Sequence, residues 1–270
     1  MRSMKRAALD GLELEYEIRG SGEQIVLVHH GAGADWFDPL WEEPSLARYR
    51  MVRYHRAGYA GSSRLVPPLT FAQEATNFRM LMRHLGLDRI HVVGHSASAC
   101  IALQIALDAS DSVHSLALLE PALMAVQSPP EVPRALELYR AGDTNAAVDT
   151  FLRGTCGAQY RRILEQAVPG AIEQALADAP TFFEHELPAL RQWSFGPDDG
   201  RHVLQPVLAV VGDQSDSRFH QRQKLLLEWL PNVEPFVLPG AGHLLHLQNP
   251  SGMAAGLAAF FARHSFGVAA

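Results

Sequence analysis

The segment 90–100 constrains the fold of this chain more than any other. Its apolar residues 90–93 predict a buried strand that ends at Gly94, and the residues after Ser98 are small and apolar, as in a helix. Ser96 lies at the turn between the two. A serine on such a turn has a strained backbone and an exposed hydroxyl, and G-x-S-x-G is the usual sequence of this nucleophile turn. Here the last position is Ser98 instead of glycine, so the rest of the chain decides whether the pattern applies.

Apolar strands and helical segments alternate along the chain, which predicts an α/β protein with a mostly parallel central sheet flanked by helices. The first two strands are expected to form a hairpin, because Asp10 and Gly11 supply a tight turn. Thr70 and Gly86 are typical helix caps, and they bound a segment with apolar residues at helical spacing. A closing helix is expected over about 250–263. The expected strands are 5–9, 12–18, 24–29, 51–54, 90–93, 113–119, 207–211 and 234–238.

The alternation stops after the sixth expected strand and resumes near Pro206. The intervening residues predict short amphipathic helices over 133–141, 144–153, 160–168 and 171–179, with no strand among them. An all-helical insertion in an α/β chain is most simply a lid over one edge of the sheet. The expected organisation is therefore a core of residues 1–121 and 206–270, with a helical lid over 122–205.

Charge and cysteine content exclude several classes of partner. The net charge is −6, from 23 basic and 29 acidic residues without a basic block, which argues against nucleic acid and anionic membranes. Cys100 and Cys156 fit no metal or disulfide pattern, and neither a signal peptide nor a membrane-spanning run is found. No metal-ligand spacing or phosphate-binding glycine loop occurs, so no metal and no cofactor are expected. These features predict a cytoplasmic protein, monomeric or homodimeric, whose partner is a small-molecule substrate.

Two further loops carry residues suited to chemistry at Ser96. His30-Gly31-Ala32-Gly33 directly follows a buried strand, and the backbone N–H of Ala32 is expected to join that of Ala97 in stabilising an oxyanion. His243 follows the last strand in a loop bordered by Gly242, where an imidazole is able to reach the serine as a general base. Acidic residues stand at strand ends between them, in the chain order serine, acid, histidine.

With these loops the chain resembles the α/β-hydrolase fold superfamily, of the serine hydrolase type with a helical lid. The matching stretches cover nearly the whole chain: 28–31, 54–62, 94–98, 239–243 and 247–250. The resemblance implies that the serine attacks a carbonyl group and that the lid shapes the substrate pocket. Ser98 departs from the family's glycine, whose purpose is close packing of helix against strand, and a small serine preserves that packing at little cost.

The acid of the triad is the second departure. The commonest acid of the family lies three residues after a glycine that ends the seventh strand; here that glycine is Gly212 and the position holds Ser215. Some members carry the acid at the end of the strand after the nucleophile, and this position is Glu120, which has no basic neighbour in its segment. A carboxylate directly after an apolar strand needs a partner if it is buried. Glu120 is therefore the expected acid, with Asp216 and then Asp213 as alternatives.

Other residues near these loops have both a functional and a packing interpretation. His95 is expected either to line the pocket or to pack beside the serine, and His246 competes with His243 for the role of base. His29 and His30 are expected to brace their loop. An apolar pocket beneath the lid is expected to include several large side chains, each of which is equally suited to ordinary packing: Trp36, Phe37, Met124, Phe182, Phe183 and Trp193.

The predicted function is a serine hydrolase that cleaves a small, largely apolar ester or lactone through an acyl-enzyme intermediate. Dehalogenases and epoxide hydrolases of this fold use an aspartate nucleophile, and Ser96 occupies that position, which disfavours both activities. Two alternatives remain open: hydrolysis of a carbon–carbon bond in a diketone-like substrate, and a small-molecule receptor of the same fold with slow turnover. Fold alone does not identify the substrate.

Overall fold

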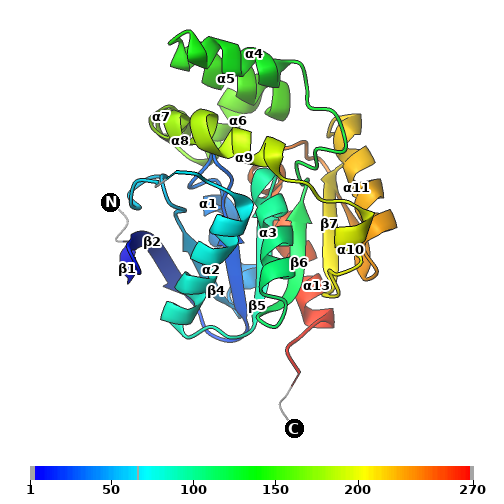
Figure 1. The fold of residues 1–270 in the computed structure, drawn as a ribbon. Coiled ribbons are helices and arrows are strands. Elements are labelled where there is room, and N and C mark those ends of the chain that lie inside the picture. Colours follow the sequence, from blue (N-terminus) through cyan, green and yellow to red (C-terminus); the bar gives the residue numbers. More distant parts are fainter. Residues whose placement is uncertain (1–3, 66, 268–270) are drawn as a thin grey trace.

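The computed structural model describes residues 4–65 and 67–267 and contains a single eight-stranded sheet within them (Figure 1). The strand order is β1-β2-β4-β3-β5-β6-β7-β8. β1 and β2 form the expected antiparallel hairpin, β2 pairs antiparallel with β4, and all later neighbours are parallel. The bounds are β1 Lys5–Leu9, β2 Leu12–Arg19, β3 Gln24–Val28, β4 Arg50–Tyr54, β5 Ile90–His95, β6 Val113–Leu119, β7 Val207–Gly212 and β8 Val233–Leu238.

The central strands are apolar throughout because helices cover both of their faces. Along β3, Val26 and Val28 pack into the apolar cluster formed with helices α2 and α3, whereas Ile25 and Leu27 pack on the opposite face with helix α13. This alternation follows from the two-residue period of a strand. The bounds of these and the other helices of the core are α1 Asp38–Trp41, a 3₁₀ turn Pro44–Leu46, α2 Phe71–Leu85, α3 Ala97–Asp108, α11 Ser217–Trp229, α12 Leu245–Gln248 and α13 Pro250–Arg263.

Helix α2 ends where its cap residues predict. The Thr70 hydroxyl accepts the backbone N–H of Gln73 at 3.0 Å, and Gly86 has a left-handed conformation with φ 63°. The short α1, the 3₁₀ turn and α12 were not predicted, because a single helical turn is too short to show periodicity. Within the described part of the chain, no helix is both long enough and apolar enough to cross a membrane.

The segment between β6 and β7 is fully described and consists of helices and loops without a strand. Its helices lie above the carboxyl ends of the parallel strands, except the last, α10, which lies beside β7 and α11 (Figure 1). They form an apolar cluster of their own, which Trp36 and Leu244 from core loops and Leu247 from α12 join. Four of the helices were expected, and α8, the π-helical turn, α9 and α10 are additional. The bounds are α4 Glu131–Arg140, α5 Thr144–Cys156, α6 Tyr160–Ala167, α7 Ala171–Ala177, α8 Ala179–Thr181, a π-helical turn Phe182–Glu186, α9 Leu187–Gln192 and α10 Pro197–Gly200.

Candidate active site

Ser96 lies on a strained turn between β5 and α3, as the sequence predicts. Its backbone has φ 56° and ψ −120°, an unusual combination for a residue with a side chain. The N–H of Ser96 donates to the carbonyl of Leu119 at 2.9 Å, which ties the turn to the end of β6. Gly94 is required for close packing, because a Cβ there would lie 2.4 Å from the carbonyl oxygen of Ser98.

Ser98 fits the turn without opening it. Its side chain is fully buried, and its hydroxyl accepts the N–H of His95 at 2.8 Å and donates to the carbonyl of Val28. The hydroxyl thus links the turn to the neighbouring strand β3. The missing glycine of the sequence pattern is replaced by a hydrogen-bonded serine of small volume.

Ser96, His243 and Glu120 come together at the carboxyl ends of the strands. His243 Nε2 lies 3.3 Å from Ser96 Oγ, and His243 Nδ1 lies 2.6 Å from Glu120 Oε2. The imidazole ring is also stacked on Phe219, with ring centroids 4.2 Å apart and planes inclined by 14°. The ring is therefore held between a hydroxyl and a carboxylate, and its plane is fixed by an aromatic neighbour.

Glu120 is buried, 1% exposed, and its carboxylate is fully engaged. Besides His243, it accepts the N–H of Gly212 at 2.8 Å and the hydroxyl of Ser215. Its backbone has a positive φ of 46°, which turns the chain sharply after β6. Ser215, at the position where the family commonly has its acid, is thus a donor to the carboxylate that contacts His243.

The alternative acids make other contacts. Asp213 accepts the backbone N–H groups of Gly240 and Ala241, so it braces the loop that carries His243. Asp216 is the N-terminal cap of α11, where it accepts the N–H of Arg218 and pairs with its guanidinium. Neither carboxylate is hydrogen-bonded to the His243 ring in the described structure, in contrast to Glu120.

Three other histidines surround His243 and are buried without a carboxylate partner among the described residues. His95 donates its Nε2–H to the backbone carbonyl of His243, 2.8 Å away, and its ring lies 4.7 Å from that of His243. Burial lowers the pKa of His30 and of His95 well below the ordinary value, and it lowers the pKa of His246 to about 3. Neither nitrogen of His246 has a hydrogen-bond partner among the described residues, so it does not contact Ser96. These rings stay neutral at physiological pH.

The predicted oxyanion donors differ in their availability. Ala97 is the first residue of α3 and lines the cavity, and its N–H has no acceptor in the described part of the chain. The N–H of Ala32 is donated to His30 Nδ1, at the long distance of 3.3 Å. The N–H of Gly31 is donated to Glu186 at 3.0 Å. Ala97 is therefore free to bind an oxyanion, and Ala32 is free only after it leaves its weak contact with His30.

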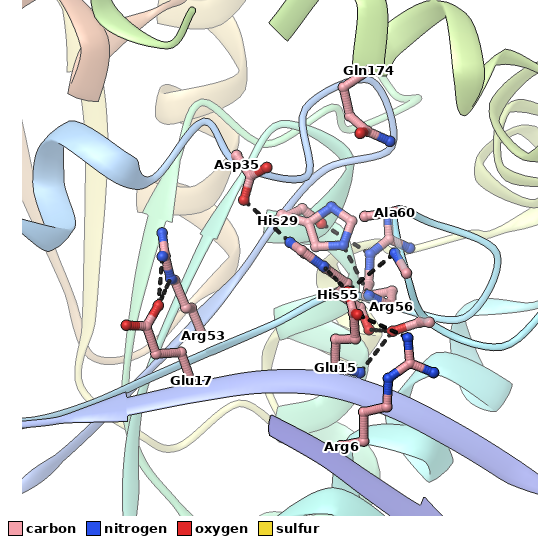
Figure 2. Close-up of polar contacts among 12 residues, drawn as sticks. Arg6, Glu15, Glu17, His29, Asp35, Arg53, His55, Arg56, Ala60 and Gln174 are labelled. Atoms are coloured by element: carbon pink, nitrogen blue, oxygen red, sulfur yellow. Dashed lines mark hydrogen bonds and ion pairs between the residues drawn. The ribbon is translucent and has the colours of Figure 1, made fainter. Parts of the chain in front are cut away.

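A polar network braces the loops after β3 and β4, as expected for His29 (Figure 2). His29 Nε2 accepts the N–H of Arg56 at 2.9 Å. Nearby, His55 lies between Asp35 and Glu15, with ring nitrogens 3.2 and 3.1 Å from their carboxylates. Burial alone would lower the pKa of His55, but hydrogen bonds and charge from these two carboxylates raise it above the ordinary value.

A buried ionic cluster joins this network to the helical segment. Arg56 is fully buried and its guanidinium contacts the carboxylates of Glu186 and, at 3.4 Å, Glu74. The Tyr59 hydroxyl donates to the same Glu186 oxygen. Glu186 lies on the π-helical turn, so one side chain connects the helices above the sheet to the loop that carries Gly31.

The cavity over Ser96 is lined mostly by residues of the helical segment and of α11. Its apolar walls include Phe182, one of the aromatic residues expected there, while Phe183 lies outside the lining. The lining residues are His30, Ser96, Ala97, Ala122, Ser128, Pro129, Val132, Phe151, Gly154, Thr155, Phe182, Glu186, Leu187, Leu190, Arg218, Phe219, Arg222 and His243.

The prediction that Trp36 and Phe37 line the cavity is wrong. Trp36 packs edge-on against His30, with centroids 4.4 Å apart, and joins the apolar cluster of the helical segment. Phe37 lies against His246 at 4.6 Å and belongs to the cluster on the α13 face. Neither ring is among the residues that line the cavity over Ser96.

The cavity lining also does not include Trp193, Met124 or His95. Trp193 donates its indole N–H to Gln104 at 2.8 Å, which directs the ring to α3. Met124 packs partly buried against the core cluster, and His95 is fully buried beneath His243. For His95 the packing alternative is the observed one. Sequence position placed these side chains near the site, but their direction was set by tertiary packing.

Glu186, Phe219 and Arg222 are cavity residues that the sequence did not single out. Glu186 lies in a segment without clear periodicity. Phe219 and Arg222 share one face of α11, at a spacing of three residues, and the start of this helix after β7 was a usable signal. Among residues 4–65 and 67–267, no group of three His, Cys, Asp or Glu side chains is arranged to hold a metal ion.

The chain belongs to the alpha/beta hydrolase fold family, whose model matches residues 24–250. The sheet order, the turn at Ser96 and the position of His243 agree with this membership. The family and a relative named as a carbamate hydrolase support a hydrolase.

Individual relatives are similar over parts of the chain. The acetyltransferase component of the acetoin cleaving system of Cupriavidus necator is 35% identical over 174 residues, which are 64% of this chain and 40% of that protein. The protein of Caulobacter vibrioides named "Putative carbamate hydrolase RutD" is 35% identical over 126 residues, 44% of this chain and 45% of that protein. The chain thus spans less than half the length of these relatives. The enol-lactonase of Burkholderia xenovorans LB400 has a TM-score of 0.81 at 18% identity, covering 96% of this chain and 100% of that chain, a likeness of fold.

Proposed function

We propose that this protein is a serine hydrolase in which Ser96 is the nucleophile, His243 the general base and Glu120 the orienting acid. The observation that carries the proposal is the continuous contact from Ser96 Oγ through the His243 ring to Glu120 Oε2. A serine hydroxyl is a weak nucleophile unless an adjacent base accepts its proton, and a carboxylate fixes that base in the required tautomer.

The reaction follows from these contacts. Ser96 Oγ attacks the substrate carbonyl while its proton passes to His243 Nε2, and the resulting oxyanion accepts the N–H of Ala97 and that of Ala32 once it leaves His30. The intermediate collapses to an acyl-serine as His243 returns the proton to the leaving alcohol. Water then repeats the sequence on the acyl-serine, and the acid product and free Ser96 result.

The substrate class is a small, largely apolar ester or lactone. Apolar side chains such as Val132, Phe151, Phe182 and Leu187 form much of the cavity wall. Most of these belong to segment 122–205, which in this proposal acts as the lid over a core of residues 1–121 and 206–270. Among the relatives, the name of the carbamate hydrolase describes cleavage of an acyl compound, in keeping with this chemistry.

The nucleophile separates this function from other activities of the fold. Dehalogenases and epoxide hydrolases of this fold have an aspartate nucleophile at the position that Ser96 occupies here. A serine at this position favours acyl transfer to its Oγ. The two alternatives from the sequence use the same residues: hydrolysis of a carbon–carbon bond in a diketone-like compound, or ligand binding with slow turnover. Parallel panels of esters, lactones and β-diketones distinguish these from ester hydrolysis.

A fluorophosphonate probe tests the nucleophile. The wild-type protein is expected to become labelled at Ser96 and to hydrolyse short aryl esters, whereas Ser96→Ala loses both properties. The exposed Ser251→Ala is the matched control, because Ser251 lies at the start of α13 and donates its hydroxyl to Glu43. Equal labelling of the wild type and Ser96→Ala would refute the proposal.

A further inference from the structure

Arg222 is a buried cation without a carboxylate partner. Arg222 is only 5% exposed, and in the described part of the chain no carboxylate lies within ion-pair distance of its guanidinium. Two of its nitrogens are used: Nε donates to the carbonyl of Leu123 at 3.1 Å, and Nη2 donates to that of Val126 at 3.2 Å. These neutral acceptors fix the guanidinium but do not neutralise it.

The third nitrogen of Arg222 is neither hydrogen-bonded within the described part of the chain nor fully buried. This nitrogen, Nη1, keeps accessible surface, and the Arg222 side chain lines the cavity over Ser96. Burial lowers the pKa of Arg222 from its ordinary value, yet a guanidinium stays protonated in proteins. A positive charge with a free donor is therefore presented to whatever occupies the cavity.

Helix α11 aims this charge beside the reacting groups. Arg218, Phe219 and Arg222 lie on one face of the helix, since residues three and four apart share a face, and all three line the cavity. Phe219 stacks on His243, and the guanidinium carbon of Arg222 lies 5.3 Å from the centroid of the Phe219 ring. The order along this wall is the imidazole, the phenyl ring and then the guanidinium.

The other charges at the cavity are already paired. Arg218 forms an ion pair with Asp216 at 2.7 Å. Glu186 is held by the buried guanidinium of Arg56. Removing a guanidinium from water is costly unless an anion compensates it, and Arg222 lacks such an anion in the protein. The compensating charge is thus expected from the ligand.

We propose that the substrate of this site carries a carboxylate, which Arg222 binds while Ser96 attacks the ester or lactone carbonyl. This inference rests on the proposed function and narrows its substrate from a largely apolar ester or lactone to one with an anionic end. A carboxylate matches the guanidinium fork geometrically, and a charged hydrogen bond is stronger than a neutral one. The apolar walls contact the chain between the carboxylate and the reacting carbonyl.

Matched ester pairs test the proposal. In the first pair, para-nitrophenyl hydrogen glutarate carries a terminal carboxylate and para-nitrophenyl pentanoate has a methyl group in its place. In the second pair, the butanoate esters of para-hydroxybenzoate and of para-cresol place the carboxylate on the leaving group. The readout is the ratio of kcat/KM for the anionic ester to kcat/KM for the neutral ester, which cancels general losses of activity.

Arg222→Gln is expected to lower this ratio about 10- to 100-fold for at least one pair, as the loss of a charged hydrogen bond predicts. Arg222→Lys keeps the charge without the fork, so it should retain part of the ratio and show that the helix still folds. Lys224→Gln removes an exposed charge from the same helix and should leave the ratio unchanged. An equal loss for both esters in Arg222→Gln, or an equal change in Lys224→Gln, would overturn the proposal.

Binding separates this inference from the proposed function. Calorimetric titration of Ser96→Ala protein with para-nitrophenyl hydrogen glutarate should show tighter binding than with the pentanoate, and adding Arg222→Gln should abolish the difference. If wild-type protein hydrolyses neither ester and takes up no fluorophosphonate, the proposed function fails while this titration still decides the anion site. If esters are hydrolysed without a role for Arg222 in either assay, only the anion site fails.

Discussion

Ser96 and Glu120 each hold a positive φ, and they are two of the three described residues other than glycine that do so. Such backbone strain costs on the order of 1–3 kcal/mol per residue, and it persists only where neighbouring contacts fix it. Here the N–H of Ser96 is bound by Leu119 O at 2.9 Å and that of Glu120 by Val210 O at 3.1 Å. The strain therefore falls on the two residues that approach the His243 ring from opposite sides.

The identity of the acid makes the sharpest prediction about a single residue. In the proposed mechanism, Glu120→Gln removes the charge that holds His243 in the tautomer needed for catalysis, so kcat should fall about 10³- to 10⁴-fold. Asp216→Asn, which alters the cap of α11, should stay within a few-fold of wild type. Steady-state kinetics on an aryl ester measures both variants. A reversed order of the two losses would move the acid to the loop after β7.

Sequence reasoning reached Glu120 because a serine stands where an acid is usual, and Asp213 and Asp216 remained as alternatives. What it could not supply was the contact that explains Ser215, whose hydroxyl donates to the Glu120 carboxylate. The directions of the aromatic side chains could not be predicted from the sequence either. Trp36 and Trp193 lie near the site in sequence terms but turn toward His30 and Gln104, as packing requires.

At the scale of elements, the π-helical turn Phe182–Glu186 links the helical segment to the core. Its Glu186 is fully buried, accepts the N–H of Gly31 at 3.0 Å and pairs with Arg56. A π-helical turn inserts an extra residue in a helix and changes the direction of the side chains that follow. Its position here brings a carboxylate to the loop that carries Ala32, one of the two predicted oxyanion donors.

Removing this carboxylate tests the link. Glu186→Ala leaves the fully buried Arg56 with one more distant partner, Glu74, so unfolding should require about 3–5 kcal/mol less free energy. Urea denaturation at neutral pH measures the change. Glu184→Ala is the control, because Glu184 lies on the same turn but is exposed. Equal stability of the two variants would show that the ionic cluster does not fasten the helical segment.

Longer elements were predictable and single turns were not. Helix α2 has caps and a repeated apolar face, and helices α4 to α7 show the same periodicity, so their approximate ranges followed from the sequence. Helices α8 and α10 contain three and four residues, too few for a period, and each has a proline near its start. Tertiary contacts hold both in place: Thr181 of α8 donates its hydroxyl to the carbonyl of Gly58 in a core loop, and α10 packs against α11.

For the whole molecule, the alternation of strands and helices predicted a parallel sheet but left its strand order open. That order places β3 between β4 and β5, so the loops after β3 and β5 meet at Ser96. The same arrangement gathers His30, His243 and His246 around the ring of His95. A cluster of buried imidazoles couples the stability of the whole fold to pH.

His246 gives this coupling a measurable sign. Burial lowers its pKa to about 3 in the folded protein, whereas the unfolded chain has the ordinary value of 6.5, so the unfolded state takes up the proton first as pH falls. The contribution to stability is complete above pH 6.5 and is lost as pH falls toward 3. His246→Leu cannot take up this proton. Between pH 7.5 and pH 5, the free energy of unfolding of the variant should therefore rise by about 2 kcal/mol relative to that of wild type. This corresponds to about 1.4 kcal/mol for each pH unit below the unfolded pKa.

Urea unfolding of wild type and His246→Leu at a series of pH values checks this expectation. Comparing the two proteins at each pH removes the contributions of the other titrating groups, and comparing pH values removes the constant effect of replacing the ring that packs on Phe37. His84→Leu serves as the control, because the His84 ring is exposed in the folded protein. A pH-independent difference between wild type and His246→Leu would mean that the folded protein accepts a proton at this ring, and the buried imidazole cluster would then tolerate charge beside His243.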